Sequence, residues 1–278
     1  MNNAKRSMLK QTAINNKLQW RHNDGIEEVE AMSTLALHNV SYKYEGTKKT
    51  VFNDVNLLFE EGKVYTIVGK SGAGKTTLLS LLSGLDIATD GIIEYNGSNL
   101  AEINRNRYRA QKAGIIFQGL NLLMNATAID NIILSMNISG VKGVDKKERA
   151  LELCKKVGIS PSTANRKILH LSGGEQQRIG IARALAHDPS IIVADEPTGN
   201  LDKNTEAKVL RIFESLAHDE KKCVIIVTHS KRVTTIADEI WALDKGVFRP
   251  LPVHNREQGT EVSGQETKNT SSKKKRRR

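Results

Sequence analysis

A glycine-rich turn between a strand-like and a helix-like segment constrains the fold of this chain more than any other feature. Residues 69–76 read GKSGAGKT, after the apolar alternation of Val64–Val68 and before the apolar run of Leu78–Leu82. A turn of this spacing aims successive backbone N–H groups and a helix N-terminus at one point, where they attract phosphate. An accidental glycine-rich turn is the alternative, and the strand-to-helix context argues against it. The sequence predicts an α/β domain that binds a nucleotide.

The positions of this phosphate loop have separate expected roles. Lys75 adds a full positive charge near the β- and γ-phosphates, and Thr76 is expected to place its hydroxyl on Mg²⁺. Thr77 is available for the α-phosphate. The expected phosphate contacts are Gly69, Lys70, Ser71, Gly72, Ala73, Gly74, Lys75, Thr76 and Thr77.

Two acidic residues follow an apolar run later in the chain. Ile191–Ala194 is continuously apolar, which suits a parallel strand buried on both faces, and it leads into Asp195 and Glu196. Ligands bind at the carboxyl ends of such strands. We therefore expect Asp195 to hold Mg²⁺ and Glu196 to orient or deprotonate an attacking water. A solvated acidic turn is the alternative, and the phosphate loop upstream argues against it.

The segment LSGGEQQR, which begins at Leu171, lies between these two motifs. Ser172 is expected to cap a helix, with Glu175 in its first turn. Capping explains the serine but leaves Gly173 and Gly174 costing backbone entropy at a helix start. A second anion site would explain both glycines.

Together the three motifs resemble those of the ATP-binding cassette (ABC) ATPases, over roughly residues 35–247. The resemblance implies a P-loop fold with a central, mostly parallel sheet, an antiparallel β subdomain and an inserted helical subdomain at about 119–170. It also implies ATP and Mg²⁺ as cofactors. In that family the serine and the following amides contact the γ-phosphate held by the loop of another cassette. Because this chain has one loop and one LSGGE segment, the resemblance implies a second cassette as partner, in a homodimer.

Single positions outside these motifs carry the same resemblance. Gln118 matches the glutamine that senses Mg²⁺ and nucleotide, and His229 matches the histidine that contacts the γ-phosphate. Asp202 matches the loop that crosses the dimer interface, and otherwise suits a helix N-cap. Tyr44 matches the aromatic residue that stacks on adenine, with Tyr42 as the competing candidate. The resemblance thus implies the catalytic residues Lys75, Gln118, Glu196 and His229, the metal ligands Thr76, Gln118 and Asp195, and nucleotide contacts from Ser172, Gly173, Gly174 and Glu175.

Apolar segments predict the order of the other elements. Strands near Leu35–Val40 and Val51–Phe59 are expected to form an antiparallel pair over the nucleotide. Ile92–Tyr95 and Gly114–Phe117 are expected to continue the sheet. The stretch from Asn121 to about Asn165 has apolar residues at helical spacing, so we expect it to be mostly helical.

The two ends of the chain differ from the expected domain at 32–254. Residues 1–31 are polar and of mixed charge, which predicts a flexible extension. Residues 255–278 are nearly free of apolar side chains and end in KKKRRR, which predicts a disordered basic tail. Such a tail would be attracted to anionic lipid by about 1 kcal/mol for each basic residue near the surface. A solvated tail without a partner is the alternative, and nucleic acid is a less favoured partner.

Composition and the positions of the cysteines indicate the cellular compartment of the protein. No apolar run approaches the roughly 18 residues of a transmembrane helix, and no apolar segment follows the first basic residues as in a secretory signal. Cys154 and Cys223 show no metal or disulfide spacing, which predicts reduced, buried thiols. With the resemblance, this predicts a cytoplasmic protein held at the inner face of the cell membrane by an integral membrane permease on another chain.

Three classes of function use a phosphate loop of this kind. Soluble ABC ATPases of DNA repair insert long coiled coils between the loop and the LSGG motif, whereas a short stretch separates Lys75 from Ser172 here. The translation factors join two cassettes in one chain, and P-loop kinases and GTPases lack an LSGG segment. The ATPase subunit of a membrane transporter is therefore favoured, with a soluble ABC ATPase as the alternative.

Three phrases in the chain point to a group of transporters. FQGLNLL, LSGGEQQRIGIARALA and ADEPTGNLD look most like cassettes of the lipoprotein-releasing, macrolide-exporting and antimicrobial-peptide-resistance group. We therefore expect an export-type transporter for a peptide, lipid, lipoprotein or drug. The substrate is chosen by the membrane subunit, so this chain leaves it undefined.

Overall fold

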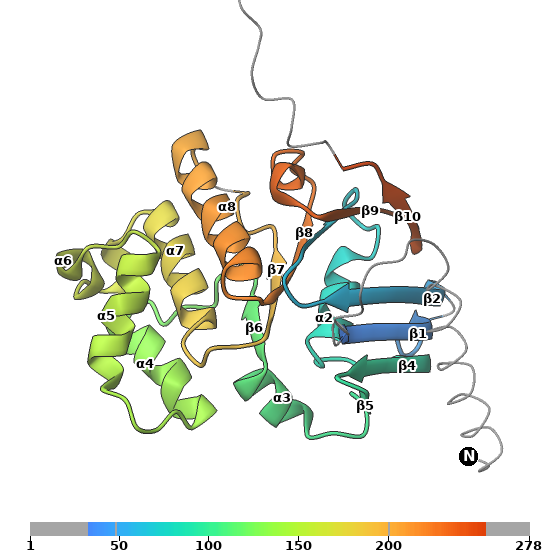
Figure 1. The fold of residues 1–278 in the computed structure, drawn as a ribbon, viewed down its shortest axis with the longest axis horizontal. Helices are drawn as coiled ribbons and strands as arrows, with labels where there is room; N and C mark the ends of the chain where they lie inside the picture. The colour runs from blue at the N-terminus through green and yellow to red at the C-terminus, as the bar shows by residue number, and fades with distance from the viewer. Residues whose placement is uncertain (1–32, 48, 200, 254–278) are drawn as a thin grey trace, which may run out of the picture.

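The computed structural model describes residues 33–47, 49–199 and 201–253. The expected extension at 1–31 and the basic tail at 255–278 lie outside the described residues. Within them, the helices α4–α8 gather on one side of the molecule and the strands β1, β2 and β4 lie on the other (Figure 1).

Two sheets form the framework. The smaller one is antiparallel and has the order β2-β1-β4-β5. The larger one has the order β10-β9-β3-β8-β7-β6, in which all neighbours pair in parallel except β10 with β9. The strands are β1 Ser33–Lys43, β2 Thr50–Glu60, β3 Val64–Val68, β4 Asp90–Tyr95, β5 Ser98–Asn99, β6 Ala113–Ile116, β7 Ile191–Asp195, β8 Cys223–Thr228, β9 Glu239–Asp244 and β10 Val247–Leu251.

This architecture confirms the predicted fold class, with one correction. The strand expected at Ile92–Tyr95 does not continue the central sheet. It lies in β4, which pairs with β1 in the antiparallel sheet.

The helices start at capping residues. Thr127 and Asp130 form a capping box on α4, Ser172 and Glu175 form one on α7, and Asp202 caps α8 by accepting from the N–H groups of its first turn. The helices are α2 Lys75–Leu82, α3 Arg105–Gln111, α4 Ala128–Ser139, α5 Lys146–Lys156, α6 Pro161–Ala164, α7 Gly173–Ala184 and α8 Lys203–His218, with 3₁₀ turns η1 Ile168–His170 and η2 Val233–Ile236.

The expectation of a mostly helical stretch from Asn121 needs a correction at its start. The residues 117–127, here called the Gln118 segment, form turns and extended chain, and the first helix begins at Ala128. Leu120 and Asn121 adopt left-handed backbone angles, with φ of 56° and 49°. A helix cannot pass through such residues, so the apolar spacing of the segment was misleading.

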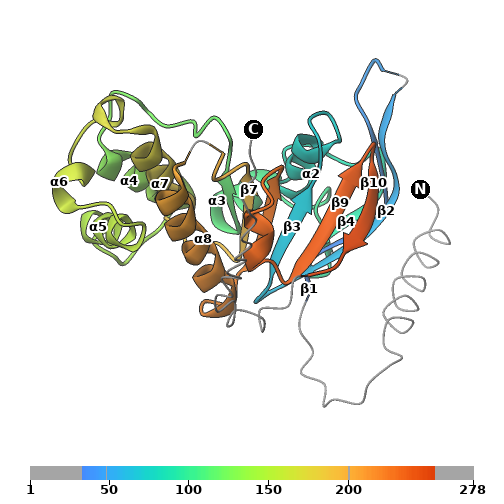
Figure 2. The same ribbon diagram turned by 90° about the horizontal axis from the view of Figure 1, so that it is seen from above.

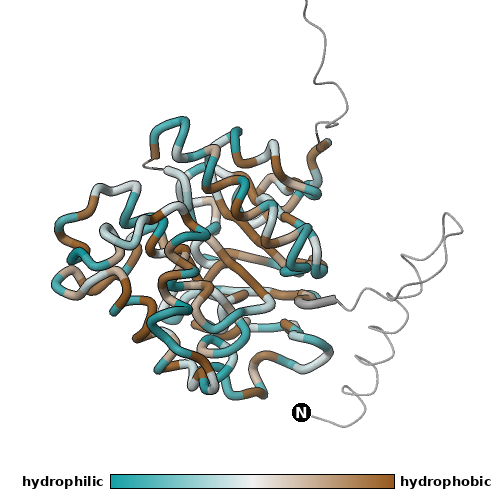
Figure 3. The backbone as a smooth tube through the Cα atoms, turned by 60° about the vertical axis from the view of Figure 1, so that its left-hand side comes forward, coloured by the Kyte–Doolittle hydropathy of each residue, from teal (hydrophilic) through white to brown (hydrophobic). Residues whose placement is uncertain are grey.

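The central strands are buried on both faces, as their apolar runs predict. Ile191 and Val193 of β7 pack with α2 and the antiparallel sheet, whereas Ile192 and Ala194 pack with α7 and α8. Figure 2 shows these two layers on opposite sides of β3 and β7, and Figure 3 shows the apolar strands in the interior. Cys154 and Cys223 are buried and free, which confirms that prediction.

The turn between β9 and β10 approaches β2 and the phosphate loop closely. Gly246 has a φ of 81°, and a Cβ atom there would lie 1.9 Å from the carbonyl oxygen of Val51. Its N–H donates to the carbonyl of Ala73 at 3.3 Å. The absence of a side chain at Gly246 therefore lets this turn come close enough to hydrogen-bond the phosphate loop at Ala73.

Substitution of Gly246 tests this contact. Gly246→Ala should lower the free energy of unfolding by about 2 kcal/mol more than Gly97→Ala, because overpacking against backbone is added to the strain of a positive φ. Gly97 is the matched control, since its φ is 77° and no atom lies within 4 Å of an added Cβ. Urea unfolding of both variants measures the difference. Equal destabilisation would contradict the close approach.

Candidate nucleotide site

The carboxyl ends of four parallel strands bring the expected site residues to one edge of the sheet. β3, β8, β7 and β6 are consecutive neighbours and run in the same direction. Gly69 follows β3, His229 follows β8, the acidic pair Asp195 and Glu196 ends β7, and Gln118 follows β6 closely. Residues distant in sequence therefore share the edge at which open α/β sheets bind ligands.

The phosphate loop leaves the start of α2 free of side-chain caps. Gly74 is the N-cap in a left-handed conformation with φ of 111°, and no side chain bonds the first N–H groups of the helix. A Cβ atom at Gly69 would lie 2.5 Å from the carbonyl oxygen of Leu243, so only glycine fits there. Lys75 Nζ donates to the carbonyls of Gly69 at 2.7 Å and Lys70 at 3.2 Å. The loop is thus shaped as a cradle for an anion.

Glu196 is the most constrained side chain of the site. It is buried, and its backbone has a φ of 47°, which is rare for a residue with a side chain. Its Oε2 accepts from the Thr228 hydroxyl at 2.8 Å and from the His229 N–H at 3.2 Å. Its Oε1 lies 2.7 Å from His229 Nδ1 and 3.8 Å from Lys75 Nζ. These partners hold one carboxylate in a single orientation.

Asp195 lies beside this carboxylate and within reach of Thr76. Burial, and secondly the charge of Glu196, raise the pKa of Asp195 above its ordinary value. The Thr76 hydroxyl is 3.4 Å from its Oδ2. Two adjacent buried carboxylates and a hydroxyl are hard oxygen ligands that a divalent cation would stabilise, and Mg²⁺ commonly takes one or two carboxylates beside phosphate oxygens and water. Thr76 and Asp195 therefore fit Mg²⁺, which would neutralise phosphate charge.

The structure distinguishes the two tyrosines proposed for adenine. Tyr42 is buried and meets Tyr44 edge-on, with ring centroids 5.2 Å apart. Tyr44 is 47% exposed, and its hydroxyl is 2.6 Å from that of Thr77 in α2. An exposed ring beside the first turn of α2 is available for stacking, whereas the ring of Tyr42 is covered.

The SGG turn, residues 172–174, is organised by the first turn of α7. The Ser172 hydroxyl and N–H both donate to Glu175, and this contact with the backbone lowers the pKa of the Glu175 carboxyl. No atom lies within 4 Å of a Cβ added at Gly173, while one at Gly174 would touch Leu201 at 3.5 Å. In the described part of the chain, no hydrogen bond joins this turn to the phosphate loop. Gly173 therefore presents open backbone outward.

Asp202 acts as the N-cap of α8. Its carboxylate accepts from the N–H groups of Asn204 and Thr205, and the contacts with Thr205 and then Asn204 lower its pKa. Its neighbour Asn200 lies outside the described residues. The expectation that Asp202 also crosses a dimer interface stays a prediction.

Sequence reasoning missed the contribution of Thr228. This fully buried threonine ends β8, and its hydroxyl donates to Glu196 and accepts from the N–H of Ser230 at 3.0 Å. The sequence did contain a sign of this role, because Thr228 is the polar last residue of an otherwise apolar strand. Thr228 thereby fixes Glu196 and the turn that carries His229.

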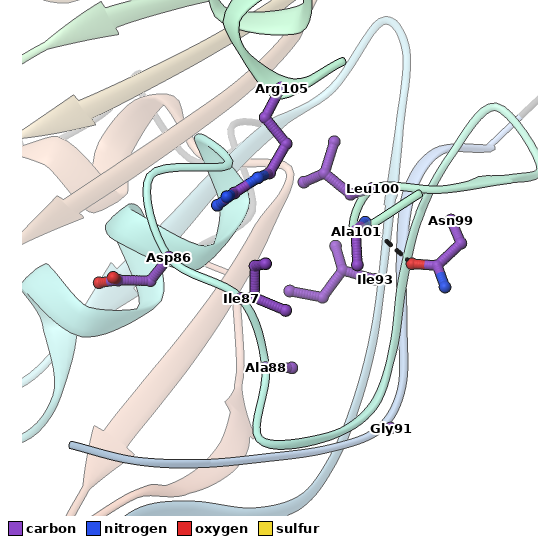
Figure 4. A pocket seen from close by; sticks show the side chains of 9 residues that line it. All are labelled: Asp86, Ile87, Ala88, Gly91, Ile93, Asn99, Leu100, Ala101 and Arg105. Atoms are coloured by element: carbon purple, nitrogen blue, oxygen red, sulfur yellow. Dashed lines mark hydrogen bonds between the residues drawn. The ribbon is translucent and has the colours of Figure 1, made fainter. Parts of the chain in front are cut away.

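A shallow hollow of about 100 Å³ lies away from these residues (Figure 4). It contains no residue of the nucleotide motifs and is bordered by the chain after α2, by β4 and by the start of α3. The lining residues are Asp86, Ile87, Ala88, Gly91, Ile93, Asn99, Leu100, Ala101 and Arg105. The candidate nucleotide site is therefore the edge of the sheet at which the parallel strands end, and not this hollow.

Comparison with known proteins agrees with this geometry. Residues 52–199 match the profile of the ABC transporter family. The chain belongs to the ABC transporter family. As an ABC cassette it is an ATPase and the ATP-binding subunit of a transporter, and none of its described helices is long and apolar enough to cross a bilayer.

The cassette is similar in sequence to several ATP-binding proteins of transporters. It is 46% identical over 217 residues to the uncharacterized ABC transporter ATP-binding protein YclH of Bacillus subtilis, which covers 78% of this chain and 96% of that protein. It is 38% identical over 207 residues to the lipoprotein-releasing system ATP-binding protein LolD of Legionella pneumophila, covering 73% and 91%. It is 40% identical over 207 residues to the methionine import ATP-binding protein MetN 2 of Enterococcus faecalis, covering 73% and 59%.

A solved structure shares the fold of the cassette. The dimeric, post-hydrolysis structure of the ATP-binding cassette MJ0796 bound to ADP and Pi has a TM-score of 0.74 and 33% sequence identity, covering 80% of this chain and 99% of that one. A nucleotide site in a cassette of this fold is therefore established, and ATP is the cofactor to be expected from it.

Substitution of Glu196 tests the chemistry of the cassette. Glu196→Gln keeps the size of the side chain but removes its negative charge and its basicity, so ATP binding should persist while kcat falls by roughly 10² or more. Lys75→Ala should also weaken ATP binding, because it removes a full charge. Steady-state ATPase assays and nucleotide titration measure the two effects. Near-normal turnover by Glu196→Gln would eliminate the proposed role of this carboxylate.

Proposed function

We propose that this cassette hydrolyses Mg²⁺-ATP as one half of a homodimer and powers an export-type membrane permease. The observation that carries the proposal is the fixed carboxylate of Glu196 beside Asp195 and Lys75. Glu196 accepts from three donors and lies at the strand edge where a γ-phosphate held by Lys75 would be placed. This arrangement supports Glu196 as the group that orients or deprotonates the attacking water.

The neighbouring groups support complementary roles. His229 Nδ1 lies 2.7 Å from Glu196 Oε1 and the side chain is 69% exposed, so Nε2 carrying a proton would be open to donate to a γ-phosphate oxygen. Thr76 and Asp195 would hold Mg²⁺, with Gln118 reaching it from the neighbouring strand end. Phosphoryl transfer depends on such positioning and charge stabilisation more than on covalent chemistry.

The outward-facing SGG turn supports a composite site. Gly173 lies at the N-terminus of a twelve-residue helix, with no atom within 4 Å of the position of an added Cβ. Such an N-terminus attracts an anion, and the second cassette of a homodimer would supply the γ-phosphate. The dimeric state of the similar cassette MJ0796 supports the same arrangement.

ATP-dependent pairing tests the homodimer. Glu196→Gln should form a dimer with Mg²⁺-ATP, because hydrolysis no longer separates the halves, and adding Gly173→Asp should abolish that dimer by placing a carboxylate against the partner's γ-phosphate. Gly173→Asp should leave the folded monomer intact, since nothing surrounds its Cβ. Light scattering and thermal unfolding measure both properties. Full ATPase activity from a strict monomer would refute the proposal.

The direction of transport rests on sequence likeness. The phrases shared with lipoprotein-releasing cassettes and the likeness to LolD support export of a lipid, lipoprotein, peptide or drug. The likeness to MetN 2 supports the competing direction, import. Identification of the membrane protein that co-purifies with the cassette decides between them.

Exposed apolar residues near Gln118 support docking of the permease. Leu123 is 53% exposed and Met124 46%, and Leu169 lies next to them because its N–H donates to the Met124 carbonyl. Leu122, by contrast, packs against the core of the helical side. Leu123, and not Leu122, is therefore available to meet the permease.

Two glutamate substitutions test this docking surface. Leu123→Glu should prevent co-purification of the membrane protein while the midpoint of thermal unfolding and ATP affinity stay unchanged, because the side chain is exposed. Leu122→Glu is the matched control and should lower the unfolding midpoint by several degrees, since it places a charge against the core. Normal co-purification of a stable Leu123→Glu variant would show that the permease docks elsewhere.

A further inference from the structure

The Gln118 segment carries two residues in a backbone conformation that must be held in place. Leu120 has a φ of 56° and Asn121 a φ of 49°. The left-handed region costs a residue with a side chain roughly 1 kcal/mol or more, and a leucine there is unusual. Neither residue contributes a ligand to the nucleotide site. A strained turn directly after Gln118 therefore needs support from elsewhere in the fold.

Arg183 in the last turn of α7 provides this support. Its guanidinium donates to the carbonyl of Leu120 through Nη2 at 2.7 Å, and to the carbonyl of Asn121 through Nη1. Burial lowers the pKa of Arg183, which indicates a charge held partly away from water. A planar guanidinium can span two successive carbonyls, and a lysine ammonium, which is a point donor, cannot match that geometry.

A second contact from the same helix faces the turn. A Cβ atom at Gly180, three residues before Arg183, would lie 3.2 Å from Leu120 Cδ2. The missing side chain lets Leu120 pack directly against α7. Positions separated by three residues lie on one face of a helix, so α7 holds the turn by packing and by hydrogen bonds together.

The middle of the Gln118 segment is bound by a different helix. The side chain of Asn131 in α4 accepts from the N–H of Leu123 at 2.8 Å and donates to its carbonyl at 3.2 Å. The segment is therefore attached to α7 near Gln118 and to α4 further on. Only the attachment to α7 involves the strained residues.

We infer that Arg183 is a positioning residue for Gln118 and joins the Gln118 segment to α7. The N-terminus of α7 carries the SGG turn, so a movement of Gln118 is transmitted through one rigid helix to the surface that would meet the nucleotide of the second cassette. The strained turn at Leu120 and Asn121 and the Arg183 side chain that holds it, here called the clamp, form one packed unit, so a displacement of one moves the other. The inference rests on the proposed role of Gln118 at the metal.

Replacing the clamp while keeping its charge provides the test. Arg183→Lys in the full chain should lower kcat for ATP hydrolysis by about tenfold, with KM for ATP changed by less than about twofold, because Gln118 is misplaced while the phosphate loop is untouched. Arg109→Lys is the matched control. Arg109 donates to the Gly84 carbonyl from α3, outside the nucleotide motifs, and its substitution should leave both constants within about twofold.

A glycine in the turn distinguishes the clamp from a general effect on folding. Glycine adopts positive φ without the steric cost, so adding Asn121→Gly to Arg183→Lys should restore kcat by about threefold or more. A role of Arg183 in packing α7 alone predicts no such rescue. If Arg183→Lys does not fold, Gly180→Ala presses a methyl group on Leu120 with the arginine intact and should lower kcat by about threefold at unchanged KM.

Gln118→Ala in the same assay distinguishes the proposed role of Gln118 from the positioning role of Arg183. Unchanged kcat in Gln118→Ala would refute the proposed role of Gln118 and the clamp with it. A fall in kcat for Gln118→Ala, together with normal kcat for Arg183→Lys or no rescue by Asn121→Gly, would overturn the clamp alone. A fall in both variants and rescue by the glycine would establish it.

Discussion

The parallel alignment of β3, β8, β7 and β6 is the constraint on which the site depends. Parallel strands end at the same edge of a sheet, so this pairing places the phosphate loop, the acidic pair, His229 and Gln118 side by side. The pairing is stable because both faces of the strands are covered, one by α2 and the antiparallel sheet and the other by the helices. Burial of apolar side chains thus positions the charged groups of the site.

The edge of the sheet also concentrates unfavourable electrostatics and strain. Asp195 has a raised pKa beside Glu196, and Glu196 has a left-handed backbone. Hydrogen bonds from Thr228 and His229 offset part of this cost, and a nucleotide with its metal would offset more. Backbone strain of this kind accumulates at functional sites because the surrounding fold overrides local preference. The strained turn at Leu120 obeys the same rule, with Arg183 as the overriding contact.

Motif spacing was sufficient to predict much of the site from the sequence. The phosphate loop, the capping box at Ser172 and Glu175, and the buried strand before Asp195 depend on local chemistry, namely glycine φ angles, cap hydrogen bonds and apolar runs. The start of the helical stretch was mispredicted at Asn121 instead of Ala128, because apolar spacing says nothing about left-handed residues that a distant arginine holds.

The sequence by itself determined the family, the phosphate-binding chemistry and the order of the elements, since each follows from residues close together in the chain. Tertiary structure alone decided that β4 pairs with β1, that Tyr44 is exposed where Tyr42 is covered, that Thr228 fixes Glu196, and that Arg183 reaches Leu120 and Asn121. These outcomes depend on contacts between segments far apart in sequence. The free energy of such contacts comes from packing and desolvation in the assembled fold, which local sequence patterns do not contain.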